Sequence, residues 1–266
     1  MTGFLIVNPH SGDGGTDELL EAAAARGIRT HVLGRNDDVA TLAREADADA
    51  IGMAGGDGSL GQVAQVASER DIPFACIPFG TRNHFARDIG LDRDDPIGAL
   101  DALVDGTERL IDVGRVNGRV FLNNVSLGVY ARLVHRREHH RRRSVTFARL
   151  RGLAILATHR EPLGITVDGE PITARVVLVS NNPYELAVLS IGERERLDEG
   201  LLHLYAPLGF LRSSWEERSG ERFTIDALSG RLQAAIDGEP EVLDTPIEFT
   251  IEARALRVLL PRGPGA

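Results

Sequence analysis

Short apolar runs alternate with amphipathic segments in the first part of the chain, and this alternation constrains the fold more than any other feature. The apolar runs lie at residues 4–7, 30–33, 50–54 and 74–77. Between them lie helical patterns at 17–26, 38–46 and 60–67, the last with apolar residues at the i, i+3, i+4 and i+7 positions of one helix face. Strands and helices that alternate at this spacing predict a parallel sheet with helices on its faces.

The second half of the chain has the pattern of hairpins. Asn117-Gly118 and Asp168-Gly169 each separate two strand-like runs, and both dipeptides tolerate the positive φ angles of a two-residue hairpin turn. Further strand-like runs follow at 201–206, 222–227, 231–236, 247–251 and 256–260. This pattern predicts an antiparallel β sandwich.

The two patterns together predict two domains. Residues 1–112 form an α/β domain with a Rossmann-like parallel sheet, ending in a helix at 96–104. Residues 113–252 form the β-rich domain, interrupted by a helical insert at about 135–158. Because 256–260 has the pattern of a strand, residues 253–266 are a candidate to complete the first domain.

Composition excludes several classes of protein and places this one in the cytoplasm. At 42% hydrophobic and 26% charged residues, the chain is not disordered, collagen-like or a coiled coil. Its single cysteine, Cys76, lies in an apolar run and predicts a buried thiol in a reducing compartment. No apolar segment approaches the ~20 residues of a membrane span, and the apolar run before Pro9 is too short for a signal peptide. We expect a cytoplasmic protein whose contact with the inner face of the membrane, if made, is peripheral.

The chain contains no lysine, since all 30 of its basic residues are arginine. This excludes the phosphate-binding loop that ends in Gly-Lys-Ser/Thr, the strand lysine of protein kinases and every lysine Schiff base. Any phosphate chemistry must therefore use backbone amides, arginine and a metal ion.

Basic residues gather in one segment of an acidic protein. The formal net charge is -9, yet residues 132–151 contain eight arginines and one acid, Glu138. Arg136 to Arg143 are therefore a candidate contact for an anionic membrane surface, with a solvated helix face as the alternative. Because few aromatic residues lie among these charges, we expect no nucleic-acid site. A homodimer is compatible with the sequence.

Three glycines mark a candidate phosphate site. Gly55, Gly56 and Gly58 lie between a predicted strand and a predicted helix, where exposed backbone amides can bind an anion. Asp57, among them, would repel phosphate unless a metal or a hydroxyl partner intervenes, so it indicates magnesium or ribose chemistry. An ordinary turn with a helix-capping aspartate remains the alternative.

Two further polar loops follow neighbouring strands. The loop at 8–15 follows the first predicted strand, and the loop at 80–83 follows the fourth. Because the carboxyl ends of parallel strands meet at one edge of a sheet, we expect all three loops to converge where open α/β folds bind ligands.

These loops resemble a known family. NPHSG (8–12), GGDGS (55–59) and PFGTRNHFA (78–86) are similar to the signature segments of the diacylglycerol kinase catalytic-domain family, which includes bacterial lipid kinases and sphingosine kinases and is distantly similar to NAD kinases. NNVSLG (123–128), RLDEGLL (196–202) and DGE (237–239) are looser matches in the second half. The resemblance implies an ATP- and Mg²⁺-dependent lipid kinase that transfers the γ-phosphate to a lipid hydroxyl, with diacylglycerol as the default acceptor.

The resemblance also assigns roles to residues. Glu239 and Asp57 are the implied catalytic residues, with Glu239 as the general base that takes the proton of the lipid hydroxyl. A metal site is implied at the Glu199 carboxylate, with the backbone oxygens of Arg196 and Leu201. From its own spacing, 237–239 is a plain hairpin turn. The implied ATP-binding residues are Asn8, Pro9, Ser11, Gly12, Gly55, Gly56, Asp57, Gly58, Ser59, Gly80, Thr81 and Asn83.

Three positions depart from the family pattern. Ser59 replaces the usual Thr, His84 stands where many members have Asp, and Glu199 replaces the second Asp of an Asp-Asp-Gly segment. Two alternatives therefore stay open. One is an NAD kinase-type phosphotransferase, and the other is a nucleotide- or membrane-binding module with little catalytic activity.

Overall fold

The computed structural model describes residues 2–11, 14–81, 83–128, 162–184, 186–187, 190–191, 194, 196–207 and 215–262. The chain divides into two compact units, one of residues 1–113 with 254–266 and one of residues 114–253. The predicted helical insert at 135–158, the basic segment Arg136 to Arg143 and the predicted ATP-binding residue Gly12 lie outside the described residues. No helix in the described part of the chain has both the length and the apolar character needed to cross a bilayer.

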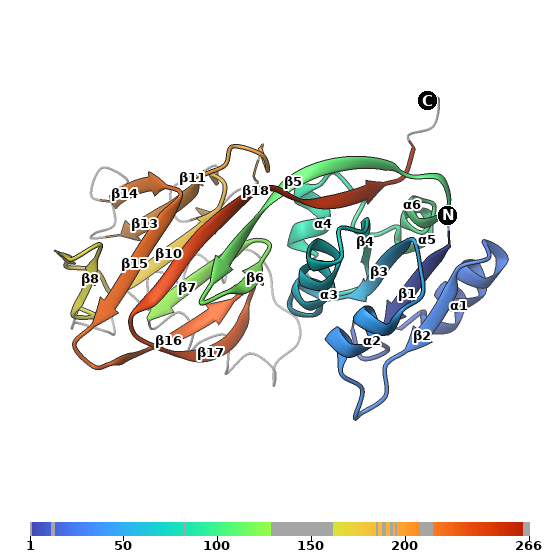
Figure 1. Cartoon of the computed structure of the whole chain (residues 1–266), viewed down its shortest axis with the longest axis horizontal. Helices are drawn as coiled ribbons and strands as arrows, with labels where there is room; N and C mark the ends of the chain where they lie inside the picture. The colour runs from blue at the N-terminus through green and yellow to red at the C-terminus, as the bar shows by residue number, and fades with distance from the viewer. Residues whose placement is uncertain are drawn as a thin grey trace. The chain divides into compact units, whose positions relative to one another are not determined.

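The first unit contains the predicted parallel sheet (Figure 1). Its strands are β1 (Gly3–Val7), β2 (Arg29–Val32), β3 (Ala50–Gly55), β4 (Phe74–Pro78) and the end of β18 (Ile247–Leu260). They lie in the order β2-β1-β3-β4-β18, and every neighbouring pair is parallel. Strands β3 and β4 are buried at every position, which explains why they read as unbroken apolar runs.

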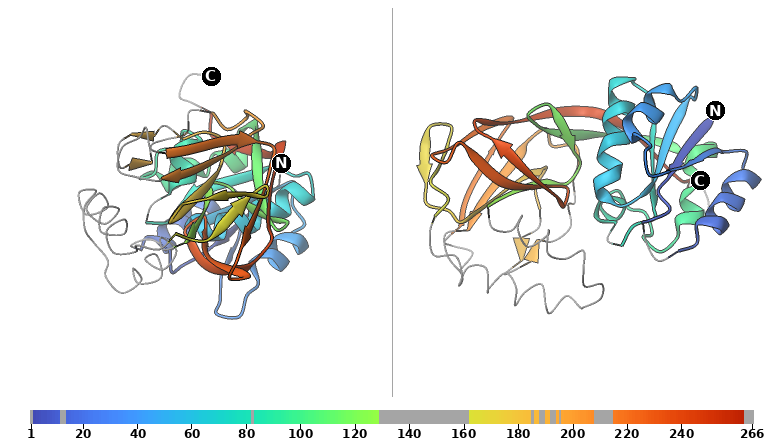
Figure 2. Two further views of the ribbon diagram at one scale, coloured as in Figure 1. Left: turned by 90° about the vertical axis from the view of Figure 1, so that its left-hand side faces the viewer. Right: turned by 90° about the horizontal axis from the view of Figure 1, so that it is seen from below.

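Helices cover both faces of this sheet. They are α1 (Thr16–Ala25), α2 (Val39–Glu45), α3 (Asp57–Glu69), α4 (His84–Asp88), α5 (Pro96–Ala99) and α6 (Ala102–Asp105). Helices α1, α5 and α6 pack on one face, whereas α2 and α3 pack together on the other (Figure 2). The helix predicted at 96–104 is thus two short helices. The fold class expected for this unit is confirmed.

The second unit is the predicted antiparallel sandwich. One sheet has the order β14-β13-β10-β7-β16-β17, and the other contains β9, β8, β15, the first half of β18, β5 and β6. The inward-facing residues of both sheets form one core, in which the rings of Phe121 and Phe249 meet edge to face at 6.4 Å. The strands are β5 (Thr107–Val116), β6 (Arg119–Phe121), β7 (Asn124–Gly128), β8 (Ile165–Val167), β9 (Glu170–Ile172), β10 (Val176–Asn181), β13 (Leu202–Pro207), β14 (Trp215–Gly220), β15 (Arg222–Ala227), β16 (Arg231–Ile236) and β17 (Glu239–Asp244). A two-stranded sheet of β11 (Leu186–Ala187) and β12 (Ser190–Ile191) completes the list.

Strand β18 serves both units. Its first residues pair antiparallel with β15, while Val258 and Leu259 pair in parallel with Phe74 and Ala75 of β4. It replaces the two separate strands predicted at 247–251 and 256–260. In the first unit a bidentate ion pair between Arg257 and Glu108 joins β18 to β5, with both N–O distances at 2.9 Å. This bond to Arg257 lowers the pKa of the Glu108 carboxyl.

Three hairpin turns of the second unit are built alike. Each begins with a residue of positive φ followed by glycine: Asn117 at 48°, Asp168 at 52° and Asp237 at 48°. In the first two turns the side-chain oxygen accepts one backbone N–H from a neighbouring strand. Glu248 donates to Asn117 Oδ1 and Thr224 donates to Asp168 Oδ1, both at 2.8 Å. The backbone N–H of each turn residue returns a bond to the carbonyl of the same neighbour. A single amide oxygen, as in Asn117, therefore suffices to hold such a turn.

Candidate functional site

The glycine-rich turn after β3 leads directly into α3. Gly56 is the N-cap of this 13-residue helix, and Asp57 is its first residue. Both the Ser59 backbone N–H and its Oγ donate to the Gly56 carbonyl, at 3.0 and 2.9 Å. Residues 56–59 are partly exposed, and among the described residues no atom lies within 4 Å of where a Gly56 Cβ would be. The amides at the start of α3 are therefore open to an anion.

The loop after β4 lies against this turn. A Cβ added to Gly80 would come within 2.6 Å of the Gly56 Cα atom, so the two glycine backbones are in direct contact. Asn83 is 5% exposed, has a φ of 47°, and accepts the Gly80 N–H on Oδ1 at 2.9 Å. Thr81 is exposed beside them. The sequence prediction that these loops converge is correct for this pair.

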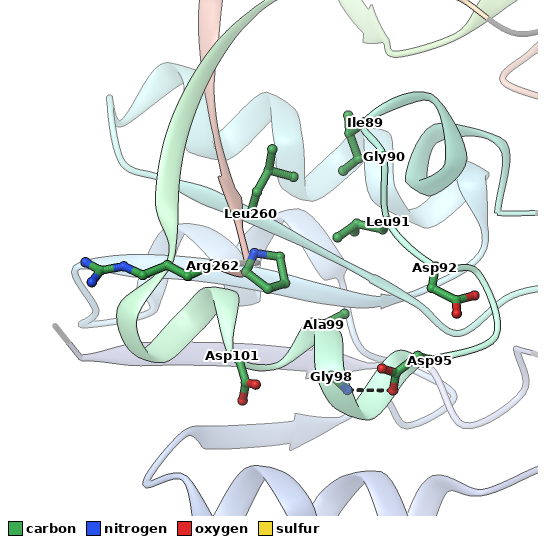
Figure 3. Close-up of a pocket in the computed structure, with 11 residues that line it drawn as sticks. Ile89, Gly90, Leu91, Asp92, Asp95, Gly98, Ala99, Asp101, Leu260 and Arg262 are labelled. Atoms are coloured by element: carbon green, nitrogen blue, oxygen red, sulfur yellow. Dashed lines mark hydrogen bonds between the residues drawn. The ribbon is translucent and has the colours of Figure 1, made fainter. Parts of the chain in front are cut away.

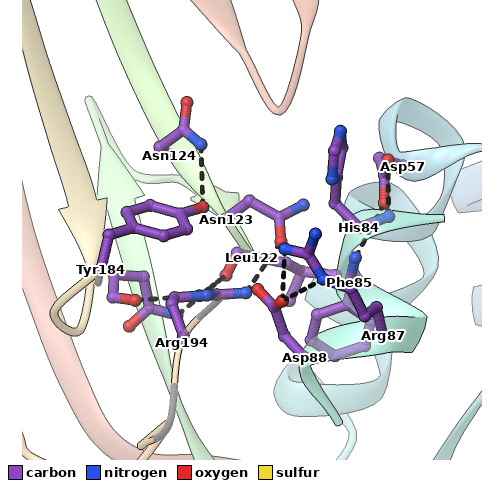
Figure 4. A network of polar contacts seen from close by, with 11 residues as sticks. Asp57, His84, Phe85, Arg87, Asp88, Leu122, Asn123, Asn124, Tyr184 and Arg194 are labelled. Carbon is purple, nitrogen blue, oxygen red and sulfur yellow. Dashed lines mark hydrogen bonds and ion pairs between the residues drawn. The ribbon is translucent and has the colours of Figure 1, made fainter. Parts of the chain in front are cut away.

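Asp57 connects the two loops (Figure 4). Its carboxylate accepts the backbone N–H groups of His84 and Phe85, the first two residues of α4, at 3.3 and 3.1 Å. The first residue of α3 thus caps the neighbouring helix. Burial raises the pKa of the Cys76 thiol, and the negative charge of Asp57 raises it further. Cys76 is 1% exposed, as its apolar surroundings predicted.

The loop after β1 lies at the same edge of the sheet. The Asn8 N–H donates to the Ala54 carbonyl at 2.9 Å, next to the register pair of Val7 and Ala54. Asn8 Oδ1 in turn accepts the His10 N–H at 3.0 Å, which shapes the turn. Pro9 and Ser11 are partly exposed there. The predicted ATP-binding residues that the structure describes therefore come from the ends of β1, β3 and β4.

Glu239 lies on the second unit, at the start of β17. It pairs with Ile236 across the Asp237-Gly238 turn, and its side chain is exposed. The carboxylate of Asp237 has a different environment, because it accepts three backbone N–H groups. The donors are Leu122 at 2.7 Å, Asn123 at 2.8 Å and Asn124 at 3.1 Å.

Sequence reasoning missed a buried arginine in this region (Figure 4). Arg194 is 3% exposed and donates to the carbonyls of Leu122 and Asn181, at 2.7 and 2.9 Å. It also donates to Asn123 Oδ1 at 2.8 Å, and its guanidinium lies 5.5 Å from the centre of the Tyr184 ring. The available signal was a second Asn-Asn pair, at 181–182, in addition to the pair at 123–124. Asn181 is the last residue of β10, and Asn124 is the first residue of β7. The antiparallel pairing of β7 with β10 brings the two pairs together.

Two of the three groups predicted to bind a metal ion have protein partners, the Glu199 carboxylate and the Leu201 carbonyl. Glu199 Oε2 lies 3.0 Å from His203 Nε2, and the Leu201 carbonyl accepts the Asn182 N–H at 3.1 Å. Arg196 lies 3.7 Å from the Asp198 carboxylate. Within the described ranges, no group of three or more His, Cys, Asp or Glu side chains could hold a metal ion. A cation at Glu199 would therefore compete with His203 for the carboxylate, and the metal site stays a prediction.

A separate pocket of about 380 Å³ lies in the first unit (Figure 3). Apolar residues such as Leu91, Ala99 and Leu260 line it together with Asp92 and Arg262. It contains none of the predicted ATP-binding residues, and its carboxylates have local roles, as in the capping of the Gly98 N–H by Asp95. We assign it no function.

The three loops of the first unit lie in a segment that matches the model of one protein family. Residues 2–116 match the family model of the diacylglycerol kinase catalytic domain. Over these residues the chain is similar to the diacylglycerol kinase catalytic domain. The match spans Asn8, the Gly55–Ser59 turn and the Gly80–Asn83 loop, so the resemblance inferred from these motifs is confirmed.

Curated relatives of this catalytic-domain family align over part or most of the chain. It is 38% identical over 99 residues to a diacylglycerol kinase of Bacillus subtilis, covering 35% of this chain and 33% of that protein. It is 37% identical over 120 residues to a diacylglycerol kinase of Mycobacterium tuberculosis, covering 42% and 39%. The chain thus aligns with between a third and two fifths of the length of these two relatives. A longer alignment, at 28% identity over 295 residues, covers 96% of this chain and 93% of a Pseudomonas aeruginosa protein named "Probable lipid kinase YegS-like".

Likeness in fold to a solved structure extends over both units. A crystal structure described as a diacylglycerol kinase from Bacillus anthracis has a TM-score of 0.70 at 20% identity, and the alignment covers 97% of this chain and 96% of that chain. This likeness supports the fold class predicted for the whole chain.

The contact between the glycine loops leads to a stability prediction. We expect Gly80→Ala to lower the melting temperature of the protein, because its new Cβ would meet the Gly56 Cα at 2.6 Å and Asn83 Oδ1 at 2.9 Å. Overpacking of this kind costs ~1–3 kcal/mol. Gly34→Ala is the matched control, since its Cβ would meet only Asp37 at an ordinary 3.6 Å. The measurement is thermal unfolding of both variants. Equal melting temperatures would show that the Gly56 and Gly80 loops can move apart without loss of stability.

Proposed function

We propose that this protein is a lipid kinase that uses ATP and Mg²⁺ to phosphorylate the hydroxyl of a diacylglycerol-like lipid. The observation on which the proposal depends is the contact of the Gly56 and Gly80 loops, joined by Asp57, within a diacylglycerol kinase catalytic domain. The names of the relatives support the same chemistry.

The first unit supplies the groups for the nucleotide in this proposal. The open amides at the start of α3 would bind the phosphates. The N-terminus of α3 is also the positive end of its helix dipole, which stabilises negative charge there. Hydroxyls of Ser59 and Thr81 and the side chain of Asn8 are further hydrogen-bonding groups at the same sheet edge. Mg²⁺ bound with ATP would neutralise the charge that develops on the transferred phosphoryl group. Because the chain has no lysine, backbone amides take the part that a lysine has in many other kinases.

The second unit supplies the general base. Glu239 is exposed and stands at the first position of β17, so a substrate hydroxyl can approach its carboxylate. In the proposed step, the lipid oxygen forms a bond to the γ-phosphorus as the bond to the ADP oxygen breaks. Glu239 accepts the proton that the lipid hydroxyl loses.

A lipid kinase must meet its acceptor at a membrane, and we propose that Arg136 to Arg143 contact anionic lipid. This segment lies outside the described residues, and the proposal depends on its sequence charge alone. Each basic residue near an anionic surface contributes ~1 kcal/mol to binding. We expect replacement of Arg141, Arg142 and Arg143 by Ser to weaken sedimentation with phosphatidylserine vesicles, with vesicles of neutral lipid as the control. Unchanged sedimentation would favour a solvated surface instead.

The decisive experiment is transfer of labelled γ-phosphate from ATP and Mg²⁺ to a panel of lipid hydroxyl acceptors, with NAD tested in parallel. Label in a lipid, dependent on Asp57, would establish the kinase and its acceptor class. Label in NADP would instead support the NAD kinase alternative. ATP binding without transfer to any acceptor would support the catalytically weak module.

A further inference from the structure

The DGE turn contains two carboxylates in very different surroundings, which separates their roles. Glu239 is exposed, whereas Asp237 is partly buried and its carboxylate accepts three backbone N–H groups. We propose that Asp237 is a positioning residue, which fixes the turn that presents Glu239 to the substrate. This inference rests on the proposed function, because it assigns Asp237 a role relative to Glu239 as the base.

The Asp237 side chain accepts more backbone hydrogen bonds than the side chains that begin the other two turns, Asn117 and Asp168. All three turns share a reciprocal pair of bonds with one neighbouring residue, which for Asp237 is Asn124. Its N–H donates to Asp237 Oδ1 at 3.1 Å, and its carbonyl accepts the Asp237 N–H at 2.9 Å. Asp237 alone among these three turns makes two further bonds to backbone amides, from Leu122 to Oδ2 and from Asn123 to Oδ1. The extra bonds exceed what a hairpin needs.

The segment that Asp237 holds is also held from its other side. Arg194 binds the Leu122 carbonyl and Asn123 Oδ1, and Asn181 Nδ2 donates to the same Leu122 carbonyl at 3.2 Å. The amides of residues 122–124 therefore bond to a carboxylate, and the oxygens of Leu122 and Asn123 bond to a guanidinium. Such a doubly held segment is a rigid support, and Asp237 transmits its position to Glu239, two residues along the chain.

Asp237→Asn isolates the extra bonds. Asn117 shows that an amide oxygen satisfies the shared pair of bonds, so the variant should fold. Its NH₂ group would replace Oδ2 and face the Leu122 N–H, which removes that bond and displaces the segment. The matched control is Asp168→Asn. The Asp168 side chain accepts one backbone N–H from the neighbouring strand, that of Thr224, and this is the bond that all three turns share.

The first measurement is hydrogen exchange at the amides of residues 122–124, which does not depend on activity. We expect these amides to exchange faster in Asp237→Asn than in the wild type, and to be unchanged in Asp168→Asn. Equal protection in all three proteins would overturn the anchoring role of Asp237. This result stands whether or not the protein phosphorylates lipid, so failure of the proposed function is distinguishable.

The second measurement is lipid kinase turnover in a double-mutant cycle. We expect Asp237→Asn to lower kcat by roughly 10- to 10²-fold, the effect of displacing a reacting group by about 1 Å, with KM for ATP unchanged. Added to Glu239→Gln, it should lower kcat no further than about twofold, because the base it positions is already gone. A full, independent loss in the Glu239→Gln background would contradict positioning. A lower melting temperature with unchanged kcat would reduce Asp237 to a stability role and also overturn the proposal.

Discussion

Glu239→Gln should lower the turnover of the lipid acceptor by roughly 10² to 10⁴, the usual contribution of a general base. Glutamine keeps the size of the side chain but has no lone pair basic enough to accept the proton of a hydroxyl. Because Glu239 is exposed at the start of β17 and has no part in the core of the sandwich, the folded structure should be unaffected. The measurement is steady-state transfer of labelled phosphate, with ATP affinity determined separately and expected to be retained.

Strand β17 itself offers the matched control for this experiment. Glu241 is exposed two residues further along and pairs with Arg119 at 2.6 Å on the surface. Such a pair is worth ~0–1 kcal/mol, so Glu241→Gln should keep normal turnover and near-normal stability. Near-normal turnover of Glu239→Gln as well would remove Glu239 from the role of base.

Asp57→Ala should abolish use of the magnesium nucleotide and also destabilise the first unit. Two N–H groups at the start of α4 would lose their acceptor, and hydrogen bonds to a charged group contribute ~1.5–3 kcal/mol each. The glycine loops that we propose to bind ATP would lose the side chain that connects them. ATP binding by titration calorimetry and unfolding by urea measure the two effects.

Asp38→Ala separates these two effects, because Asp38 caps α2 in the same unit by accepting the Thr41 N–H at 2.6 Å. Loss of this cap should cost ~0.5–2 kcal/mol and leave nucleotide binding intact. If Asp57→Ala lost stability but bound and used ATP normally, Asp57 would be only a helix cap, which is the alternative that its sequence left open.

Much of the fold was predictable because its strands are of two easily recognised kinds. The buried parallel strands β3 and β4 appear in the sequence as continuous apolar runs, and Asn-Gly and Asp-Gly dipeptides indicate the hairpin turns. Strands β14 and β17 were missed. Both lie at the edges of their sheet, and β17 has one buried position among six, so neither has the alternation that reveals a strand.

The candidate site was predictable only where one local motif contains the relevant residues. The turn at 55–59 and the DGE turn are each contiguous in sequence, so both could be named as candidates. Arg194 was not identified from the sequence, because its hydrogen bonds depend on the register between β7 and β10. That register brings the carbonyls of residues 122 and 181 together. The capping of α4 by Asp57 is equally non-local, since it links positions far apart in the chain through the contact of two strands.

Strand β18 has a consequence for the order in which the protein can be made. The ribosome completes β1 to β4 early, yet the strand that pairs with the free edge of β4 arrives only with Val258 and Leu259. Until then, the edge of β4 at Phe74 and Ala75 stays uncovered while the whole second unit is synthesised. The stretch that matches the family model, residues 2–116, therefore does not contain the strand that pairs with this edge. The last strand of the parallel sheet comes from the far end of the chain, so we infer that the first unit closes after the second has been translated.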